Sequence, residues 1–307
     1  MKEISIIVPC FNEEETIELF LSESFKVKDL LPNCVFEYIF VNDGSTDNTL
    51  SILRKLSSKF PHVHYLSFSR NFGKEAALLA GLKHSTGNYV AVMDADLQDP
   101  PDLLPEMINL IDNGYDIVGT RREDREGEPA IRSFFAKLFY KIINKVSETE
   151  MVDGARDFRL MSRQVVNSII EIQEVNRFSK GIFSWVGYDT TYLSFKNRER
   201  VAGETSWSFQ KLVKYSLEGF INFSEALLNL SIYSGITTFV ISVIGILFII
   251  VRKLTFGDSV NGWASLATIV LFMGSMELLS LGILGKYIAK IFLETKKRPT
   301  YFIKEKK

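Results

Sequence analysis

The segment Tyr89-Val90-Ala91-Val92-Met93-Asp94-Ala95-Asp96 joins an apolar run of strand length to two carboxylates that are two residues apart. Residues at this spacing in an extended chain point the same way, so Asp94 and Asp96 can meet one cation. Magnesium in nucleotide sites is held by one or two carboxylates together with the phosphates of the substrate. A solvated turn leaves the same short pattern, so the surrounding sequence has to decide between the two interpretations.

Strand-like runs alternate with helical stretches on both sides of this segment. The strand-like runs are Ile4–Val8, Tyr38–Val41, His64–Phe68, Tyr89–Met93 and Ile117–Val118, and the helical stretches are Glu13–Ser24, Thr46–Lys59, Lys74–His84 and Leu103–Ile111. Such alternation predicts an α/β fold, Rossmann-like, in which helices cover both faces of a largely parallel sheet. Ligands of open sheets of this kind lie beyond the carboxyl ends of the strands.

Polar and charged residues gather where the predicted strands end. They are Pro9, Asn12 and Glu13, then Asn42 and Asp43, Ser69 and Arg70, Asp94 and Asp96, and Thr120 and Arg121. No G-x-G-x-x-G follows the first strand and no P-loop lysine motif is present, which argues against a dinucleotide-binding protein and against a P-loop NTPase.

Composition restricts the remaining classes. The chain has 307 residues and a net charge of −1, so it can hold one domain of ordinary size plus a further part, and it lacks the basic excess expected of a nucleic-acid-binding protein. Cys10 and Cys34 have no metal-ligand spacing and are predicted to be buried free thiols. The apolar run at the N-terminus is too short for a secretory signal, so we expect the N-terminal domain in the cytoplasm.

Two long apolar stretches near the C-terminus predict a transmembrane hairpin. No charged residue occurs from Ala226 to Val251, and a second stretch from about Trp263 to Gly285 is interrupted only by Glu277. Each is long enough to cross a bilayer, and we expect spans at about 228–251 and 263–285 within 226–290. Glu277 is predicted to face a neighbouring helix or a water-filled crevice, and its role is either in packing or in function. The basic residues favour a cytoplasmic location for both termini: Lys286, Lys290, Lys296, Lys297 and Arg298 follow the second span, against Arg252 and Lys253 between the spans.

Two amphipathic stretches precede the hairpin. Over about 130–147 apolar residues keep helical spacing while Lys137, Lys141 and Lys145 recur every four residues, and residues 208–225 repeat the apolar pattern. We expect both helices in the membrane interface, although a helix facing a protein core would have the same apolar stripe.

Four motifs together resemble one enzyme family. They are Ser5-Ile6-Ile7-Val8-Pro9-Cys10-Phe11-Asn12-Glu13-Glu14, Val41-Asn42-Asp43-Gly44-Ser45-Thr46-Asp47, Ser69-Arg70-Asn71-Phe72-Gly73-Lys74 and Asp94-Ala95-Asp96-Leu97-Gln98-Asp99-Pro100. In this order they resemble family 2 glycosyltransferases of the GT-A fold, in particular the polyisoprenyl-phosphate glycosyltransferases, which include dolichol-phosphate mannose synthases and bactoprenol glucosyltransferases. The resemblance covers essentially the whole chain. The Q-x-x-R-W element of processive synthases is absent, and Arg177-Phe178-Ser179-Lys180-Gly181 occurs in that region, so transfer of a single sugar is favoured.

The resemblance implies a role for particular residues. The nucleotide sugar would be bound by Pro9, Asn12, Glu13, Asp43, Arg70, Lys74 and Asp94, and Mg2+ or Mn2+ by Asp94, Asp96 and Gln98. The catalytic residues would be Asp96 and Asp157, with Asp157 as the base or the acceptor-positioning group. The phosphate of the acceptor would be bound by Arg121, Arg132 and Arg200, since guanidinium groups suit phosphate oxygens.

Each of these roles has a plainer alternative. The Asp43–Asp47 motif is also typical of a turn and helix cap. Arg70, Lys74 and the three acceptor-site arginines are also typical of charged surface residues. Asp157 could form a structural ion pair with Arg156 or Arg159.

The whole pattern predicts a bacterial plasma-membrane enzyme. A cytoplasmic GT-A domain (1–207) would precede the juxtamembrane helix (208–225), the hairpin (226–290) and a cytoplasmic C-terminal tail (291–307). The expected reaction is inverting transfer of one hexose, glucose from UDP-glucose, to polyprenyl (undecaprenyl) phosphate for modification of cell-envelope glycans. GDP-mannose, UDP-N-acetylhexosamine and aminoarabinose donors are alternatives, and the rival classes are a nucleotidyltransferase and a non-enzymatic membrane scaffold. A homo-oligomer is left open.

Overall fold

The computed structural model describes residues 1–123, 140–145, 147, 152–196, 224, 226–256 and 262–307. Arg132, Arg200, nearly all of 208–225 and most of the predicted helix at about 130–147 lie outside the described residues. The predictions made for them therefore stay predictions.

The N-terminal part is an α/β structure built on one mixed sheet. Within the described residues the sheet has eight strands in the order β7-β5-β6-β4-β1-β2-β3-β8. Pairing is parallel for β1–β2, β2–β3, β1–β4 and β5–β7, and antiparallel where β6 and β8 enter, so the prediction of a largely parallel sheet is confirmed. The strands are β1 (Lys2–Cys10), β2 (Cys34–Asn42), β3 (Val63–Phe68), β4 (Tyr89–Val92), β5 (Ile117–Arg122), β6 (Ala155–Ser162), β7 (Thr190–Phe195) and β8 (Ile303–Lys306).

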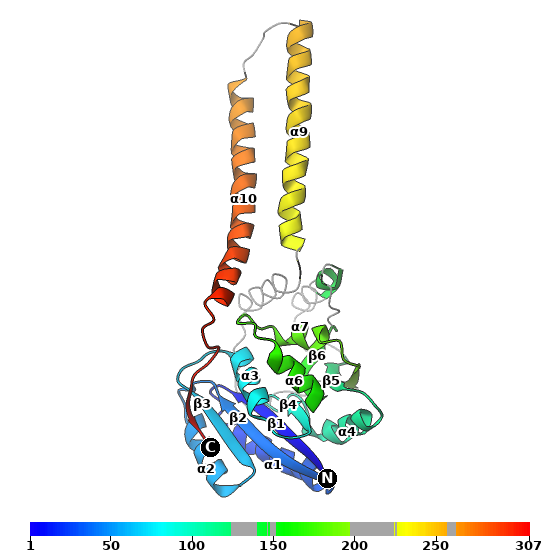
Figure 1. The fold of residues 1–307 in the computed structure, drawn as a ribbon, viewed down its shortest axis with the longest axis vertical. Coiled ribbons are helices and arrows are strands. Elements are labelled where there is room, and N and C mark those ends of the chain that lie inside the picture. The colour runs from blue at the N-terminus through cyan, green and yellow to red at the C-terminus, as the bar shows by residue number, and fades with distance from the viewer. Residues whose placement is uncertain (124–139, 146, 148–151, 197–223, 225, 257–261) are drawn as a thin grey trace.

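Helices cover both faces of the sheet (Figure 1). They are α1 (Ile17–Asp29), α2 (Thr49–Lys59), α3 (Lys74–His84), the 3-10 turn η1 (Pro101–Leu103), α4 (Leu104–Asp112), α6 (Arg163–Glu171) and α7 (Ser179–Trp185). Strand β1 contributes to both resulting cores, because Ile6 and Val8 pack with α1, α2 and α4 while Ile7 packs with α3, α6 and α7. This double burial explains why the central strands are apolar throughout.

Close packing of α3 on β1 depends on a glycine. A Cβ atom added at Gly81 would lie 2.2 Å from Cγ2 of Ile7, so a larger residue would push the helix off the strand. The N-terminal end of α3 carries Lys74, and the helix therefore holds this lysine close to the carboxyl ends of the central strands.

The order of the strands places a topological switch point between β1 and β4. The chain passes from β1 to β2 and β3 on one side, and then returns to the other side of β1 with β4. Ligands of open α/β sheets bind at this type of switch point, beyond the carboxyl ends of the strands. Strand β6 runs antiparallel to β4, so its N-terminal end, with Asp157, reaches the same edge as the carboxyl end of β4.

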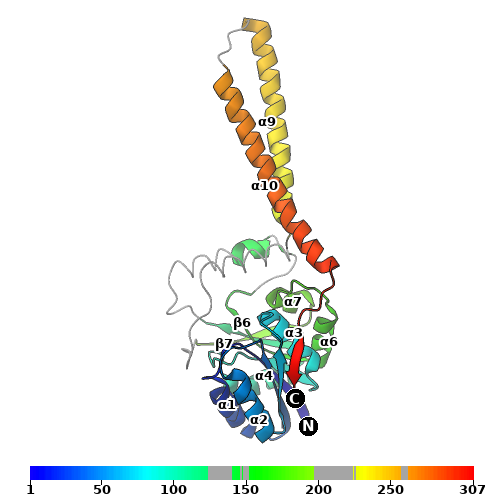
Figure 2. The same ribbon diagram turned by 90° about the vertical axis from the view of Figure 1, so that its left-hand side faces the viewer.

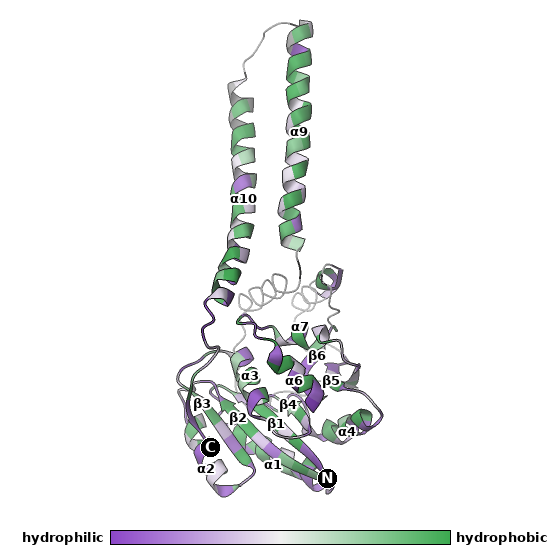
Figure 3. Ribbon diagram, in the orientation of Figure 1, coloured by the Kyte–Doolittle hydropathy of each residue, from purple (hydrophilic) through white to green (hydrophobic). Residues whose placement is uncertain are grey.

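Two long helices stand away from the sheet (Figures 1 and 2). Helix α9 spans Ala226–Phe256 and α10 spans Trp263–Thr295, ten residues beyond the expected end of the second span at 285. Both are apolar over most of their length (Figure 3), and the stretches Leu228–Arg252 and Ile269–Thr295 are long and apolar enough to cross a membrane, with none of their apolar windows buried in the chain. Glu277 is exposed on α10.

The end of α10 is attached to the sheet domain. The carboxylate of Glu294 accepts hydrogen bonds from the backbone N–H groups of Val175 and Asn176, each at 3.0 Å. This contact joins the last turn of the apolar helix to the segment that leads into α7.

The chain then returns to the sheet as its last strand. Strand β8 pairs antiparallel with β3, and the ring of Tyr301 stacks on Phe68 with centroids 5.0 Å apart. Glu305 contacts Arg54 and Tyr65. Strand β8 lies within residues 291–307, for which the sequence predicts only a cytoplasmic tail. A run as short and as charged as Ile303-Lys304-Glu305-Lys306 gives little strand signal on its own.

We expect truncation after Arg298 to lower the apparent melting temperature of the detergent-solubilised protein, because it exposes the edge of β3 and uncovers the Phe68 ring. Glu305→Ala, the matched control, should lower the melting temperature much less, because it removes only the side-chain contacts to Arg54 and Tyr65 and leaves β8 paired with β3. Equal melting temperatures for the truncated and full-length proteins would contradict a stabilising role for β8.

Candidate active site

Asp43 fastens the end of β2 to the segment in front of α3. Its side chain is buried, and its two oxygens accept hydrogen bonds from the backbone N–H groups of Phe72 at 2.6 Å and Gly73 at 2.9 Å. Burial raises the pKa of Asp43, and the two amides partly oppose this effect. Gly44 has a φ of 66° and a Cβ there would lie 2.4 Å from the backbone carbon of Arg70, so only glycine allows the two segments to approach this closely.

The turn that follows Asp43 is held from the end of β1. Asn12, at a φ of 56°, accepts a hydrogen bond from the Thr46 amide at 2.9 Å and donates its own amide to Ser45 Oγ at 2.9 Å. The neighbouring Glu13 accepts from Thr16 Oγ1 at 2.6 Å. The turn that was one alternative for residues 43–47 is therefore present, and these side chains shape the loop at the carboxyl ends of β1 and β2.

Asp94 and Asp96 lie just beyond β4, which ends at Val92. The argument that an extended strand would turn both carboxylates the same way is therefore wrong, because these residues belong to the turn that follows the strand. Leu97 sits in this turn at a φ of 56°, a conformation that costs a leucine about 1 kcal/mol. The backbone N–H of Gln98 donates a hydrogen bond to Asp96 Oδ1 at 3.1 Å, and Asp96 is only 6% exposed.

Lys74 joins Asp94 to Asp157. Its Nζ lies 2.7 Å from Asp94 Oδ1 and also donates a hydrogen bond to Asp157 Oδ2. Burial alone would lower the pKa of Lys74, but Asp157 and Asp94 outweigh it and raise this pKa. Burial would likewise raise the pKa of Asp157, but Lys74 and Lys180 outweigh it, so the pKa of this carboxyl is strongly lowered.

The ion pair of Asp157 differs from the one that the sequence suggested. Its partner is Lys74 rather than Arg156 or Arg159. Arg159 donates hydrogen bonds to the backbone carbonyls of Asp157 and Arg156, and its guanidinium lies 3.6 Å from the ring centroid of Phe183. These contacts place the guanidinium of Arg159 against the backbone and the aromatic ring.

Arg156 forms a second buried pair beside the first. Its Nε donates to Asp99 Oδ1 at 2.7 Å and its Nη2 donates to Gln98 Oε1 at 3.2 Å. Asp99 is 1% exposed, and burial raises its pKa to about 6 although Arg156 opposes the shift. Asp99 belongs to one of the four motifs but has no predicted role, because nothing in the motif indicates a partner 57 residues away.

The donor set fits a hard divalent cation that is held jointly with a nucleotide. Asp94, Asp96 and Gln98 offer carboxylate and amide oxygens, the ligands that Mg2+ and Mn2+ prefer. Among the described residues, no group of three or more acidic, histidine or cysteine side chains is already arranged around a metal position. Phosphate oxygens would therefore have to complete the coordination.

The remaining predicted residues surround this centre more loosely. Pro9 pairs with Val41 at the ends of β1 and β2. Arg70 is exposed, with its guanidinium 4.0 Å from the ring centroid of Phe72. Arg121 is exposed at the end of β5 and donates to Ser194 Oγ at 2.9 Å.

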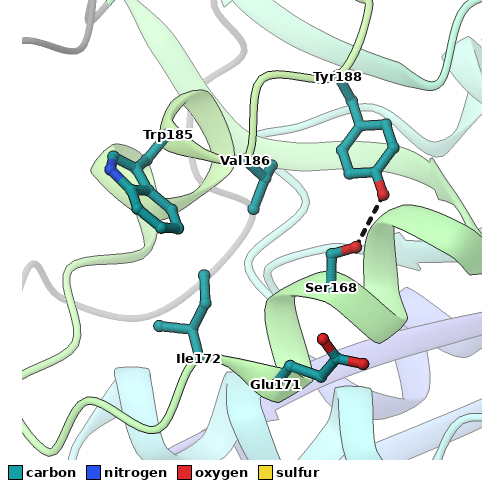
Figure 4. A pocket seen from close by; sticks show the side chains of 6 residues that line it. All are labelled: Ser168, Glu171, Ile172, Trp185, Val186 and Tyr188. Atoms are coloured by element: carbon teal, nitrogen blue, oxygen red, sulfur yellow. Dashed lines mark hydrogen bonds between the residues drawn. The ribbon is translucent and has the colours of Figure 1, made fainter.

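A cavity of about 430 Å³ lies between α6 and α7 (Figure 4). Tyr188 and Ser168 hydrogen-bond across it at 2.8 Å. Its lining contains none of the residues predicted to bind the donor, the metal or the acceptor: it consists of Ser168, Glu171, Ile172, Trp185, Val186 and Tyr188.

We expect Asp99→Ala to destabilise the protein by about 3 kcal/mol, because it leaves the guanidinium of Arg156 without its carboxylate in a site where this arginine is only 17% exposed. The free energy of unfolding of the detergent-solubilised protein measures the effect. The double variant Asp99→Leu/Arg156→Met removes both charges and should recover most of the loss. A double variant as unstable as the single one would show that the ion pair is not the cause.

Comparison with known proteins gives one family. A family model described as Glycosyl transferase family 2 matches residues 5–170. The chain is 43% identical over 305 residues to the bactoprenol glucosyl transferase of Shigella phage SfX, covering 99% of this chain and 100% of that protein. It is 46% identical over 302 residues to a protein of Bacillus subtilis (strain 168) provisionally named glycosyltransferase CsbB, covering 98% of this chain and 91% of that protein. It is also 41% identical over 305 residues to the prophage bactoprenol glucosyl transferase homolog of Escherichia coli (strain K12), covering 99% of each.

Proposed function

Since the chain belongs to glycosyl transferase family 2 and is a glycosyltransferase, we propose that it transfers one glucose from UDP-glucose to polyprenyl (undecaprenyl) phosphate, with inversion at the anomeric carbon. Two relatives of matching length carry the name bactoprenol glucosyl transferase, which supports both the lipid acceptor and the sugar.

One observation carries the proposal. Three carboxylates, Asp94, Asp96 and Asp157, reach the same edge of the sheet beside β1, at its topological switch point. The pair Asp94–Asp96 follows β4, whereas Asp157 comes from the antiparallel β6. Carboxylates therefore reach this edge from the turn after β4 and from β6. The pair after β4 suits the donor, and the carboxylate on β6 suits the acceptor.

On the donor side, Asp94, Asp96 and Gln98 would hold Mg2+ or Mn2+. The divalent cation, when bound, stabilises the negative charge that accumulates on the departing nucleoside diphosphate. Asn12, Glu13 and Asp43 border the pocket for the base and ribose, and Pro9 supplies backbone there. Arg70 and Lys74 add positive charge near the phosphates.

On the acceptor side, the nucleophile is already charged. A phosphate monoester has a second pKa of about 6, so its oxygen attacks the anomeric carbon without first losing a proton to the protein. Asp157 is therefore an acceptor-positioning group rather than a base, in agreement with its lowered pKa. Arg121, Arg132 and Arg200 bind the acceptor phosphate.

Helices α9 and α10 anchor the enzyme in the bacterial plasma membrane as a hairpin, with the catalytic domain and both termini in the cytoplasm. Strand β8 supports this topology, because it follows α10 in the chain and yet pairs in the same sheet as the N-terminal strands. A lipid acceptor would keep its tail in the bilayer while its phosphate reaches the carboxylates.

We expect Asp96→Ala to abolish transfer while the protein still inserts into membranes, because Asp96 would no longer neutralise the divalent cation at the diphosphate. The assay is incubation of purified protein with polyprenyl phosphate and a panel of UDP-glucose, GDP-mannose, UDP-N-acetylhexosamine and aminoarabinose donors, with products identified by mass spectrometry. The control Glu106→Ala removes an exposed carboxylate on α4 and should leave the rate unchanged. Turnover by Asp96→Ala at the wild-type rate would refute the proposed role of Asp96. A product formed from another donor of the panel would replace UDP-glucose as the proposed donor.

We expect Arg121→Ala to raise the KM for polyprenyl phosphate about tenfold, because the loss of one charge-assisted contact to phosphate costs on the order of 1.5 kcal/mol. The KM for the nucleotide sugar should stay the same. Steady-state kinetics with each substrate varied in turn separates the two constants. A defect confined to the donor KM would remove Arg121 from the acceptor site.

A further inference from the structure

The ammonium group of Lys74 lies between the carboxylates of the proposed donor and acceptor sides. It is in contact with Asp94 and with Asp157, which come from the end of β4 and from β6. One positive charge therefore already offsets part of the negative charge of two carboxylates that would otherwise attract a metal ion. Consistently, the described residues contain no ready-made cluster of three acidic, histidine or cysteine ligands.

The backbone that carries Lys74 is fixed, whereas its side chain borders open space. Lys74 is the first residue of α3, and the two preceding amides, those of Phe72 and Gly73, are held by Asp43. Its side chain is 36% exposed, so it is not enclosed by the core. A lysine has a flexible four-carbon stem and a compact charge, so its ammonium can move to a new anion without movement of α3.

A bound nucleotide changes the balance of charge at this point. Its diphosphate brings negative charge and oxygen ligands, and a divalent cation in a nucleotide site relies on such oxygens to complete its coordination. The ammonium of Lys74 then has a second anion within reach of its stem. Once it turns toward the phosphates, it leaves Asp94 available to the metal.

We propose that Lys74 is a positioning residue that occupies the carboxylates of the empty site and so makes binding of the divalent cation depend on binding of the nucleoside diphosphate. This inference rests on the proposed function, because it concerns the same site. Metal and nucleotide are coupled through one side chain, so each raises the affinity of the protein for the other by the same factor.

The test is calorimetric titration of the purified full-length protein with Mn2+, in the absence and in the presence of UDP. Lys74→Met removes the charge but keeps most of the apolar stem, and it should bind Mn2+ without UDP at least about tenfold more tightly than the wild type, because a unit charge a few ångströms from the metal position is removed. Lys74→Arg retains the charge and should stay near the wild type. Lys83→Met changes an exposed lysine on the same helix and should have no effect.

The coupling itself gives a second readout. UDP should raise the Mn2+ affinity of the wild type much more than that of Lys74→Met. Should Lys74→Met fail to fold because it leaves two carboxylates unpaired, the double variant Lys74→Met/Asp157→Asn keeps the charge of the site balanced and should still bind Mn2+ alone more tightly than the wild type. Unchanged or weaker Mn2+ binding by the folded variants would overturn the inference.

Failure of the proposed function would look different. A wild-type protein that binds neither UDP nor Mn2+, alone or together, would argue against the donor site as a whole and would overturn both proposals. Tight joint binding of UDP and Mn2+ by the wild type, with no effect of Lys74→Met, would overturn only the role of Lys74.

Discussion

The contact of one ammonium with two carboxylates holds the centre of this molecule together. Lys74 belongs to α3, Asp94 follows β4 and Asp157 lies on β6, so this one contact connects a helix to β6 and to the turn after β4. Two negative charges at this distance would repel each other without the lysine, and the turn after β4 already contains a leucine with an unfavourable backbone conformation. The arrangement of the carboxylates therefore depends on the cation between them.

A second, independent ion pair, Arg156–Asp99, stabilises the same region. Arg156 binds Asp99 and Gln98, and thereby attaches the turn after β4 to the start of β6 at two further points. Asp43 performs the corresponding task on the other side of β1, where it holds the amides of Phe72 and Gly73. Charged and polar side chains that look like ligand-binding groups in the sequence thus also maintain the shape of the loops.

Local signals in the sequence were sufficient for the first five strands, β1 to β5, but β6, β7, β8 and the contacts between distant segments were not predicted. The bounds of α3 (Lys74–His84) agree with the prediction, because its apolar residues are continuous and Gly73 marks its start. The partner of Asp157 was missed because Lys74 is 83 residues away, whereas Arg156 and Arg159 are neighbours in the chain. Strand β6 was missed because charged residues interrupt its first half, and β8 because its strand character comes from pairing with β3. The positive φ of Leu97 has no signal in a leucine side chain.

The position of β8 also has a consequence for biosynthesis. The ribosome makes β3 early, but the strand that covers its outer edge consists of the last residues of the chain, after both long apolar helices. Until β8 has been synthesised, β3 is an open edge of the kind that can pair with strands of other chains. The nascent chain therefore carries this aggregation-prone edge while both long helices are being made, and the sheet becomes complete only after the hairpin has been synthesised.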